Sequence, residues 1–212
     1  MNANKTKNEE TKPADPFGIL ASTEEVMRRA RHVSIDSDKI SAAAERVRQR
    51  LEAGLEKPET SFGSTGRYED DCQLVFLLDS VNFCFWPDAT KPKWRVNGTG
   101  GWYSLVNCFA RSSKRGIPIL DAAYLSNLPI KDARAIFLGD NGVEIPMLTE
   151  RANNLREAGK VLAEKFGGRF INALQNADFD VVEIVRMLYE NFSSFRDEAV
   201  YDNKSVRFLK RA

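Results

Sequence analysis

The stretch MLTERANNLREAGKVLAEKF, residues 147–166, carries the clearest structural signal in the sequence. Its apolar residues recur every three or four positions and form one stripe: Leu148, Leu155, Ala158, Leu162 and Phe166. This spacing places them on one face of an α-helix, with charged residues mostly on the other face. Gly167 and Gly168 then end or kink the helix. The sequence therefore predicts a long amphipathic helix that packs against a core.

Apolar residues at helical spacing on both sides of this stretch predict further helices. They are expected at residues 22–30, from residue 37 onward, and at 102–115, 129–137, 170–176, 180–189 and 206–211. Residues 67–80 fit either a helix or a strand, and a helix is preferred. The first is expected to start at Ser22, which has the spacing of a capping box with Glu25. Residues 1–14 are polar and charged, which predicts a disordered tail.

One segment favours β-structure instead. FCFW at 83–86 and KWRV at 93–96 are rich in aromatic and β-branched residues, and Asn97-Gly98 is a turn signal. These features predict a small hairpin near residues 83–98. The sequence shows no alternation of strands and helices of the βαβ type. The expected fold is therefore mainly α, a helical bundle in a single domain over residues 15–212.

Composition limits the class of substrate. The chain has 212 residues, of which 42% are apolar, a value typical of a soluble globular protein. Its 31 Lys and Arg and 30 Asp and Glu give a net charge of +1. A protein that binds a nucleic-acid backbone normally carries a clear basic excess. The balance therefore favours a small-molecule substrate over intact RNA or DNA.

The cysteine and histidine inventory argues against a metal site. Cys72, Cys84 and Cys108 have no C-x-x-C spacing, and His32 is the only histidine. A zinc site needs four closely arranged ligands, so no metal is expected. His32 follows Arg31 near a predicted helix end and is expected to have a structural role there. Three cysteines without a signal peptide indicate a cytoplasmic protein, and no apolar run is long enough to span a membrane.

The segment LLDSVNFCFW, residues 77–86, is the leading ligand-binding candidate. Aromatic rings stack on flat heterocycles, while a carboxylate and an amide read hydrogen-bonding groups on their edges. The candidate residues are Asp79, Asn82, Phe83, Phe85 and Trp86. A core segment with two polar residues at a turn would show the same residue types. In a strand, Phe83 and Phe85 share one face and Trp86 takes the other, so all five line one pocket only if the segment turns.

Two other clusters are candidates for substrate contacts. In GGWYS at 100–104, Tyr103 and Ser104 lie near a predicted helix start, where free N–H groups can bind phosphate, although a loop followed by a cap would look the same. Arg196, beside Asp197, has a planar fork suited to phosphate, and a structural ion pair is an equal alternative.

Several longer blocks together resemble the queuosine salvage family of queuosine 5′-phosphate N-glycosidases. They cover nearly everything after residue 15: DPFGIL (15–20), RHVSI (31–35), LDSVNFCFW (78–86), GGWYSL (100–105), RGIPILDAAYLSNL (115–128), IFLGDNGVEIPMLTERANNLREAGKVLAEKFGG (136–168) and ENFSSFRDEAVYDNKSVRFLKRA (190–212). The resemblance implies a fold similar to helical DNA glycosylases. It also implies hydrolysis of the N-glycosidic bond of queuosine 5′-phosphate, which releases queuine for salvage into tRNA modification, with no cofactor.

Family members continue beyond the point where this sequence stops, so the chain resembles the first two-thirds of such a protein. An Asp associated with catalysis lies in that further segment of the family. Within this chain, Asp79, Asp140 and Asp197 are weak candidates for the catalytic carboxylate. We therefore expect weak or no activity from the chain alone. A non-catalytic base-binding or interaction fragment is the alternative, and a DNA or RNA glycosylase is a third that the neutral charge disfavours. The sequence does not indicate the oligomeric state.

Overall fold

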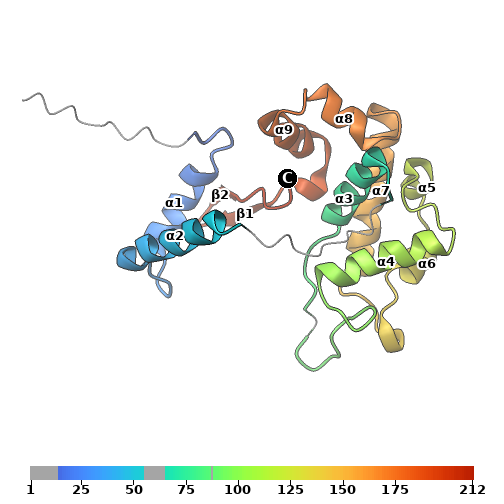
Figure 1. Cartoon of the computed structure of the whole chain (residues 1–212), viewed down its shortest axis with the longest axis horizontal. Coiled ribbons are helices and arrows are strands. Elements are labelled where there is room, and N and C mark those ends of the chain that lie inside the picture. Colours follow the sequence, from blue (N-terminus) through green and yellow to red (C-terminus); the bar gives the residue numbers. More distant parts are fainter. Residues whose placement is uncertain (1–13, 55–64, 87) are drawn as a thin grey trace, which may run out of the picture. The chain divides into compact units, whose positions relative to one another are not determined.

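A computed structural model describes residues 14–54, 65–86 and 88–212. These residues are mainly helical, as predicted, with one two-stranded antiparallel sheet (Figure 1). Residues 1–13 of the predicted tail lie outside the described residues. The chain divides into two compact units. One contains the residues up to Ser34 together with Glu198–Phe208, and the other contains Ile35–Asp197 together with Leu209–Ala212.

The smaller unit packs α1 (Ile19–Arg29) against a hairpin of β1 (Glu198–Tyr201) and β2 (Lys204–Arg207). Glu198 pairs with Arg207 and Tyr201 with Lys204. The two turn residues, Asp202 and Asn203, both have positive φ, as the tightest hairpin turns require. The helix predicted at 206–211 is therefore wrong, because residues 204–207 extend to pair with β1.

The start of α1 also differs from the prediction. The carboxylate of Asp15 accepts hydrogen bonds from the backbone N–H groups of Ile19 (2.8 Å) and Ala21 (2.9 Å), so the helix begins at Ile19. Ser22 lies inside the helix, and its hydroxyl donates to the Ile19 carbonyl. An upstream aspartate thus satisfies the free N–H groups that the capping box was expected to satisfy.

The hairpin expected near residues 83–98 does not form. Among the described residues of that segment, only an isolated bridge between Val96 and Thr99 is present, closing the predicted turn at Asn97 and Gly98. The carboxylate of Asp140, in the turn η1 (Asp140–Gly142), accepts from both turn N–H groups, at 3.2 and 2.9 Å. The predicted turn at Asn97 and Gly98 therefore forms, but its N–H groups bond to the Asp140 side chain and the turn does not join two strands.

The helix α2 (Ser37–Glu52) forms as predicted, with the Asp36 carboxylate accepting from the N–H groups of Asp38 and Lys39. Its apolar positions, including Ile40, Val47 and Leu51, are more than half exposed.

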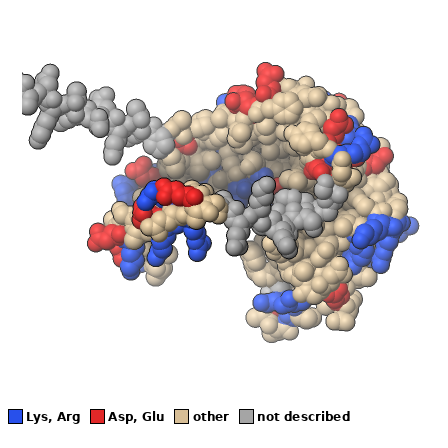
Figure 2. All heavy atoms as spheres, in the orientation of Figure 1, with Lys and Arg blue, Asp and Glu red and all other residues tan. Residues whose placement is uncertain are grey.

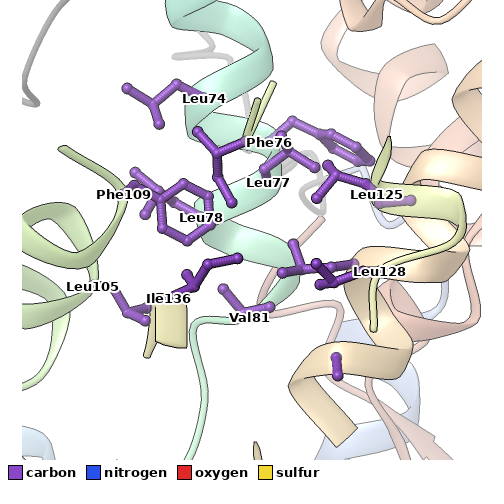
Figure 3. Close-up of a cluster of buried hydrophobic side chains, with 14 of the residues drawn as sticks. Leu74, Phe76, Leu77, Leu78, Val81, Leu105, Phe109, Leu125, Leu128 and Ile136 are labelled. Carbon is purple, nitrogen blue, oxygen red and sulfur yellow. The ribbon is translucent and has the colours of Figure 1, made fainter. Parts of the chain in front are cut away.

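The core of the larger unit surrounds α3 (Tyr68–Ser80). The sequence fitted either a helix or a strand at these residues, and the preferred helix is the one that forms. Figure 3 shows Leu77, Leu78 and Val81 among side chains from the neighbouring helices. The enclosing helices are α4 (Trp102–Lys114), α5 (Ala122–Ser126), α6 (Ile130–Ile136) and α7 (Leu148–Lys165). Leu77 and Leu78 have no exposed surface, and the buried residues of α3 all lie between Gln73 and Ser80.

The long helix predicted from residues 147–166 is confirmed as α7, and its apolar stripe faces the core. Leu155 and Leu162 are fully buried. The short helix α5 packs on α7 so closely at Gly159 that an added Cβ would lie 2.4 Å from the backbone nitrogen of Ser126. Only a glycine fits at this crossing.

Two more helices and a short turn complete the larger unit: α8 (Phe170–Asn176), α9 (Val181–Asn191) and η2 (Ser193–Phe195). The Asp180 carboxylate caps α9 by accepting from Glu183 N–H at 3.0 Å. Both helices match their predicted ranges to within two residues. Together with α3, α8, α9 and η2 position the site described next.

Candidate functional site

A cavity of about 480 Å³ opens between α3, α8, α9 and η2. Pockets that hold small molecules are typically of this size and largely apolar. Phe76 stacks nearly parallel on Phe170, with ring centroids 4.2 Å apart, and on Phe195, at 5.5 Å. All three rings line the cavity. The cavity therefore has an aromatic wall made of three buried rings that stack on one another.

The sequence of α3 explains why polar groups border this wall. Cys72, Phe76 and Asp79 are spaced three or four residues apart, so they share one side of the helix and all line the cavity. Tyr68, one turn earlier, also lines it. One helix thus supplies an aromatic ring, a thiol, a phenol and a carboxylate to the same space.

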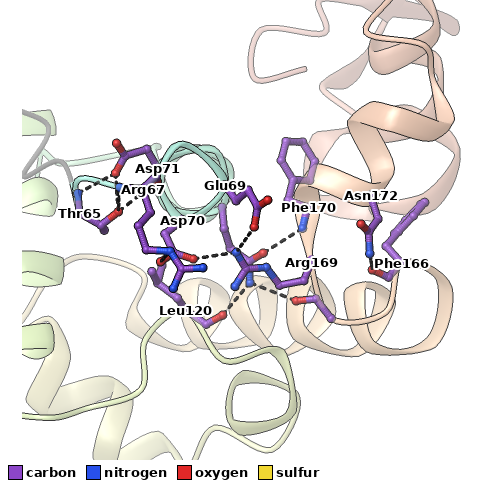
Figure 4. A network of polar contacts seen from close by, with 12 residues as sticks. Thr65, Arg67, Glu69, Asp70, Asp71, Leu120, Phe166, Arg169, Phe170 and Asn172 are labelled. Atoms are coloured by element: carbon purple, nitrogen blue, oxygen red, sulfur yellow. Dashed lines mark hydrogen bonds and ion pairs between the residues drawn. The ribbon is translucent and has the colours of Figure 1, made fainter.

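The position of Phe170 is fixed by Gln73, which is fully buried. The Gln73 side-chain oxygen accepts from Phe170 N–H at 2.8 Å, and its Nε2 donates to the carbonyl oxygens of Leu120 (2.6 Å) and Gly168 (3.2 Å). Figure 4 shows this network beside the ion pair of Arg169 with the α3 carboxylates, including Asp70 at 2.7 Å. The start of α8 is therefore tied to α3 by both buried and surface contacts.

Asp79 is the carboxylate of the predicted site that faces the cavity. It is half-buried, and burial raises its pKa above the usual range, while a hydrogen bond from Asn82 opposes the shift. That bond, from Asn82 Nδ2 to Asp79 Oδ1, is long at 3.5 Å. Among the described residues, no cation forms an ion pair with Asp79. A half-buried carboxyl without a cation in a cavity is a common property of functional sites.

Arg211 also lines the cavity, and sequence patterns gave no sign of it. Its Nη2 and Nε donate to Asp197 Oδ1 at 2.6 and 3.0 Å, and its backbone N–H donates to Oδ2 at 2.9 Å. Asp197 is thus engaged in a half-buried ion pair. The guanidinium carbon of Arg211 lies 5.4 Å from the ring centre of Phe83.

The segment after α3 is organised by Arg151, a fully buried residue of α7. Its guanidinium donates to the carbonyl oxygens of Val81, Phe83 and Cys84, and its Nε donates to Pro146. The same group lies over the rings of Phe83 (4.3 Å) and Phe85 (5.1 Å). Burial lowers the pKa of Arg151 to about 10, so it stays charged at neutral pH.

The aromatic candidates of this segment therefore divide. Phe83 contacts both Arg151 and Arg211, whereas Phe85 stacks on the buried Trp94 at 6.0 Å and belongs to the core periphery. Trp86 is 72% exposed and does not line the cavity. Asn82 lies beside Asp79. The chain does turn after α3, but the five candidate residues do not meet at one pocket. Asp79 and Asn82 lie side by side, whereas Phe85 packs at the edge of the core and Trp86 is exposed.

The remaining sequence candidates lie elsewhere. Ser104 is fully buried, and its hydroxyl is held by Val96 N–H and the Thr99 carbonyl, while Tyr103 is exposed outside the cavity. Arg196 donates to the carbonyl oxygens of Tyr189 and Glu190 at the end of α9. Asp140 holds the 97–98 turn. None of these four residues lines the cavity beside α3.

His32 lies in a different hollow, of about 400 Å³ in the smaller unit, with Arg29, Arg31, Tyr201 and Asp202. Arg29 and Asp202 form an ion pair there. Across the described ranges no group of three or more His, Cys, Asp or Glu side chains is arranged to hold a metal ion. No helix in those ranges is both long and apolar enough to cross a membrane. Both signs of charge are spread over the face shown in Figure 2.

Comparison with known proteins identifies the family. A sequence model described as "Queuosine salvage protein" matches residues 63–212. A protein of Sphaerobacter thermophilus named queuosine 5′-phosphate N-glycosylase/hydrolase is 39% identical over 204 residues, 94% of this chain and 61% of its own length. A mouse protein of the same name is 34% identical over 93% of this chain and 60% of its own length. A bovine protein of the same name is 36% identical over 69% of this chain and 44% of its own length.

The chain thus spans about 60% of the length of the first two relatives. The matched residues include α3, α7, α8, α9 and the whole cavity wall. The chain belongs to the queuosine salvage protein family.

Proposed function

We propose that this chain acts in the hydrolysis of queuosine 5′-phosphate and that the cavity beside α3 holds the base. The observation that carries the proposal is the combination of a three-ring aromatic wall with the half-buried carboxyl of Asp79. Relatives that carry the name queuosine 5′-phosphate N-glycosylase/hydrolase support the choice of substrate.

The reaction breaks the bond between C1′ of the ribose and a base nitrogen. The bonding electron pair leaves with the base, that nitrogen gains a proton, and the oxygen of a water molecule bonds to C1′. The products are queuine and ribose 5-phosphate. The sugar passes through an oxocarbenium-like state, which a nearby carboxylate stabilises, as in glycoside cleavage.

Among the three sequence candidates for a carboxylate, Asp79 is the one free to meet a ligand. Asp140 and Asp197 are held by backbone N–H groups and by Arg211, respectively. In the proposed complex Asp79 accepts hydrogen bonds from N–H groups on the edge of the base, and none of the three carboxylates is assigned to C1′. The three free cysteines of the chain support a reducing compartment such as the cytoplasm.

Calorimetric titration with queuine tests the base-binding part. We expect wild-type chain to bind queuine and to discriminate against adenine, and Asp79→Ala to weaken queuine binding about 10-fold or more. Asp88→Ala is the matched control, because Asp88 is exposed and its carboxylate accepts from the N–H and hydroxyl groups of Thr90 in its own turn. Wild-type chain that binds neither queuine nor the nucleotide would overturn the proposal.

Liquid chromatography of queuine released from queuosine 5′-phosphate tests the hydrolytic part, with buffer alone as background. We expect only weak release above background, reduced further in Asp79→Ala. Binding without any release would restrict the proposal to recognition of the base.

A further inference from the structure

Arg211 has one hydrogen-bonding group left over at the cavity. Its Nε, Nη2 and backbone N–H all donate to Asp197, while Nη1 carries no hydrogen bond to any residue that the structure describes. The side chain is held in place by this bidentate pair and by its contact with the Phe83 ring. Because Arg211 lines the cavity, its Nη1 is the preorganised donor that this side chain can offer to a ligand.

The charges around the cavity indicate what this donor meets. The positive charge of Arg211 is already balanced by Asp197, and the cavity is also lined by Asp71 and Asp79. Asp79 has no cation as a partner among the described residues, so its negative charge is not balanced by an ion pair there. A phosphate would therefore face more negative than positive charge here. A neutral oxygen acceptor suits the site better.

Asp79 supplies the complementary half of the site. No ion pair joins Asp79 to Arg211 among the described residues, so the carboxylate can accept and the guanidinium can donate at the same time. A ring that carries a carbonyl oxygen beside an N–H group and an amino group presents the matching pattern, and it stacks on aromatic faces. The 2-amino-4-oxopyrimidine half of a 7-deazaguanine has this arrangement.

We propose that Arg211 is a specificity-determining residue whose Nη1 donates to the ring carbonyl of the base while Asp79 accepts from the adjacent N–H groups. This assignment rests on the proposed function, because it takes the base to lie in the cavity beside α3. Asp197 is the positioning residue that holds Arg211. Arg196, the arginine expected from the sequence, is bonded to carbonyl oxygens of α9 instead.

The test compares two ligands that differ at one atom, 7-deazaguanine and its 6-thio analogue, in calorimetric titrations. Both keep the ring N–H and amino groups that Asp79 meets, but sulfur is a weak acceptor. We expect wild-type chain to prefer the oxo ligand about 10-fold or more. Arg211→Met is expected to remove the preference, and Asp197→Asn to reduce it. Arg134→Met, in an exposed pair with Glu144, should leave it unchanged.

The design of the test distinguishes a variant that fails to fold from one that lacks only the Arg211 donor. The preference is a ratio of two affinities in one sample, so the fraction of folded protein cancels. The double variant Arg211→Met with Asp197→Asn also avoids leaving an unpaired half-buried carboxylate. Circular dichroism melting checks every variant.

The possible results of these titrations distinguish the role of Arg211 from the proposed function. An undiminished oxo preference in Arg211→Met would overturn the assignment and leave the proposed function standing. So would a loss confined to queuosine 5′-phosphate with free bases unaffected, which would make Arg211 a phosphate ligand. A wild-type chain that binds neither base would overturn the proposed function and this inference with it.

Discussion

The guanidinium of Arg151 lies 4.3 Å above the ring of Phe83 and donates to the carbonyl oxygen of the same residue. The two residues are 68 positions apart in the sequence. Arg151 thus sets both the ring position and the backbone path of the segment that follows α3. None of the ion pairs between described residues includes this fully buried cation, so carbonyl oxygens and aromatic faces supply its stabilisation.

Arg151→Met should therefore be strongly destabilising. It leaves the carbonyl oxygens of Val81, Phe83 and Cys84 without their donor, and we expect a loss of about 3 kcal/mol or more in the free energy of unfolding. Urea denaturation measures the change. Arg134→Met is the control and should stay within about 0.5 kcal/mol of wild type. If Arg151→Met lowers the free energy of unfolding no more than Arg134→Met does, the contacts of Arg151 are not stabilising.

Asp79→Asn should make the protein more stable at neutral pH. Burial raises the pKa of Asp79 in the folded state, so the folded chain binds this proton more tightly than the unfolded chain. The carboxyl therefore costs stability as pH rises from the ordinary aspartate pKa through the raised one. We expect a higher Tm for the variant at pH 7 and a smaller gain as pH falls toward the ordinary pKa. A variant with lower Tm than wild type at pH 7 would contradict the role of burial.

Leu155→Ala and Leu162→Ala test the core face of α7. Both side chains are fully buried, and each truncation should cost about 2–5 kcal/mol. Lys160→Ala on the exposed side of the same helix serves as the control, with an expected change within about 0.5 kcal/mol. Chemical denaturation of the three variants compares them directly. Small losses for both leucines would mean that the stripe is not packed as the structure has it.

Gly159→Ala should destabilise, although alanine is the better helix former. Its methyl group would collide with the backbone of α5 at Ser126 and Ala122, which forces α5 and α7 apart. We expect a cost of about 2 kcal/mol or more. Gly100→Ala, where an added Cβ meets nothing within 4 Å, should be close to neutral. Thermal melting of the two variants gives the comparison, and equal Tm values would refute the close approach.

The thiol of Cys72 should report on occupation of the cavity. Cys72 lines it, whereas Cys108 is buried, and burial raises the pKa of the Cys108 thiol to about 12. In a Cys84→Ser chain we expect one thiol to react with a chromogenic disulfide and one to resist, because the thiolate is the reactive form. Queuine should slow the reactive one. An unchanged rate at saturating queuine would place the base elsewhere.

The helices were predictable where local periodicity and burial agree. The stripe of α7 repeats over several turns, and no competing signal interrupts it. The 83–98 segment shows the limit of such patterns. Its residues favour strands, but Arg151 donates to two of its backbone carbonyls, those of Phe83 and Cys84, and Trp94 donates to the Phe137 carbonyl at 2.9 Å. Contacts with residues far along the chain therefore overrode local preference.

The residues of the candidate site were predictable where they are close in the sequence, and not where they come from distant segments. Asp79, Asn82 and Phe83 are neighbours in the sequence, and helical spacing brings Phe76 to the side of Asp79. Arg211 and Phe195 come from the far end of the chain, and no local pattern relates them to α3. Asp197 pairs with Arg211, while the neighbouring Arg196 donates to carbonyl oxygens of α9. Which of several arginines meets a given carboxylate depends on packing that one sequence does not display.

Gln73 also has a consequence for the order in which the chain folds. Its amide joins residues that are 47, 95 and 97 positions away, so the contacts that hold Phe170 connect distant parts of the chain. Closing loops of this length costs entropy before any contact compensates it, so such contacts form late. The aromatic wall is thus a product of the completed fold rather than of any early segment. A chain that opens at α8 should lose its ligand before it loses its helices.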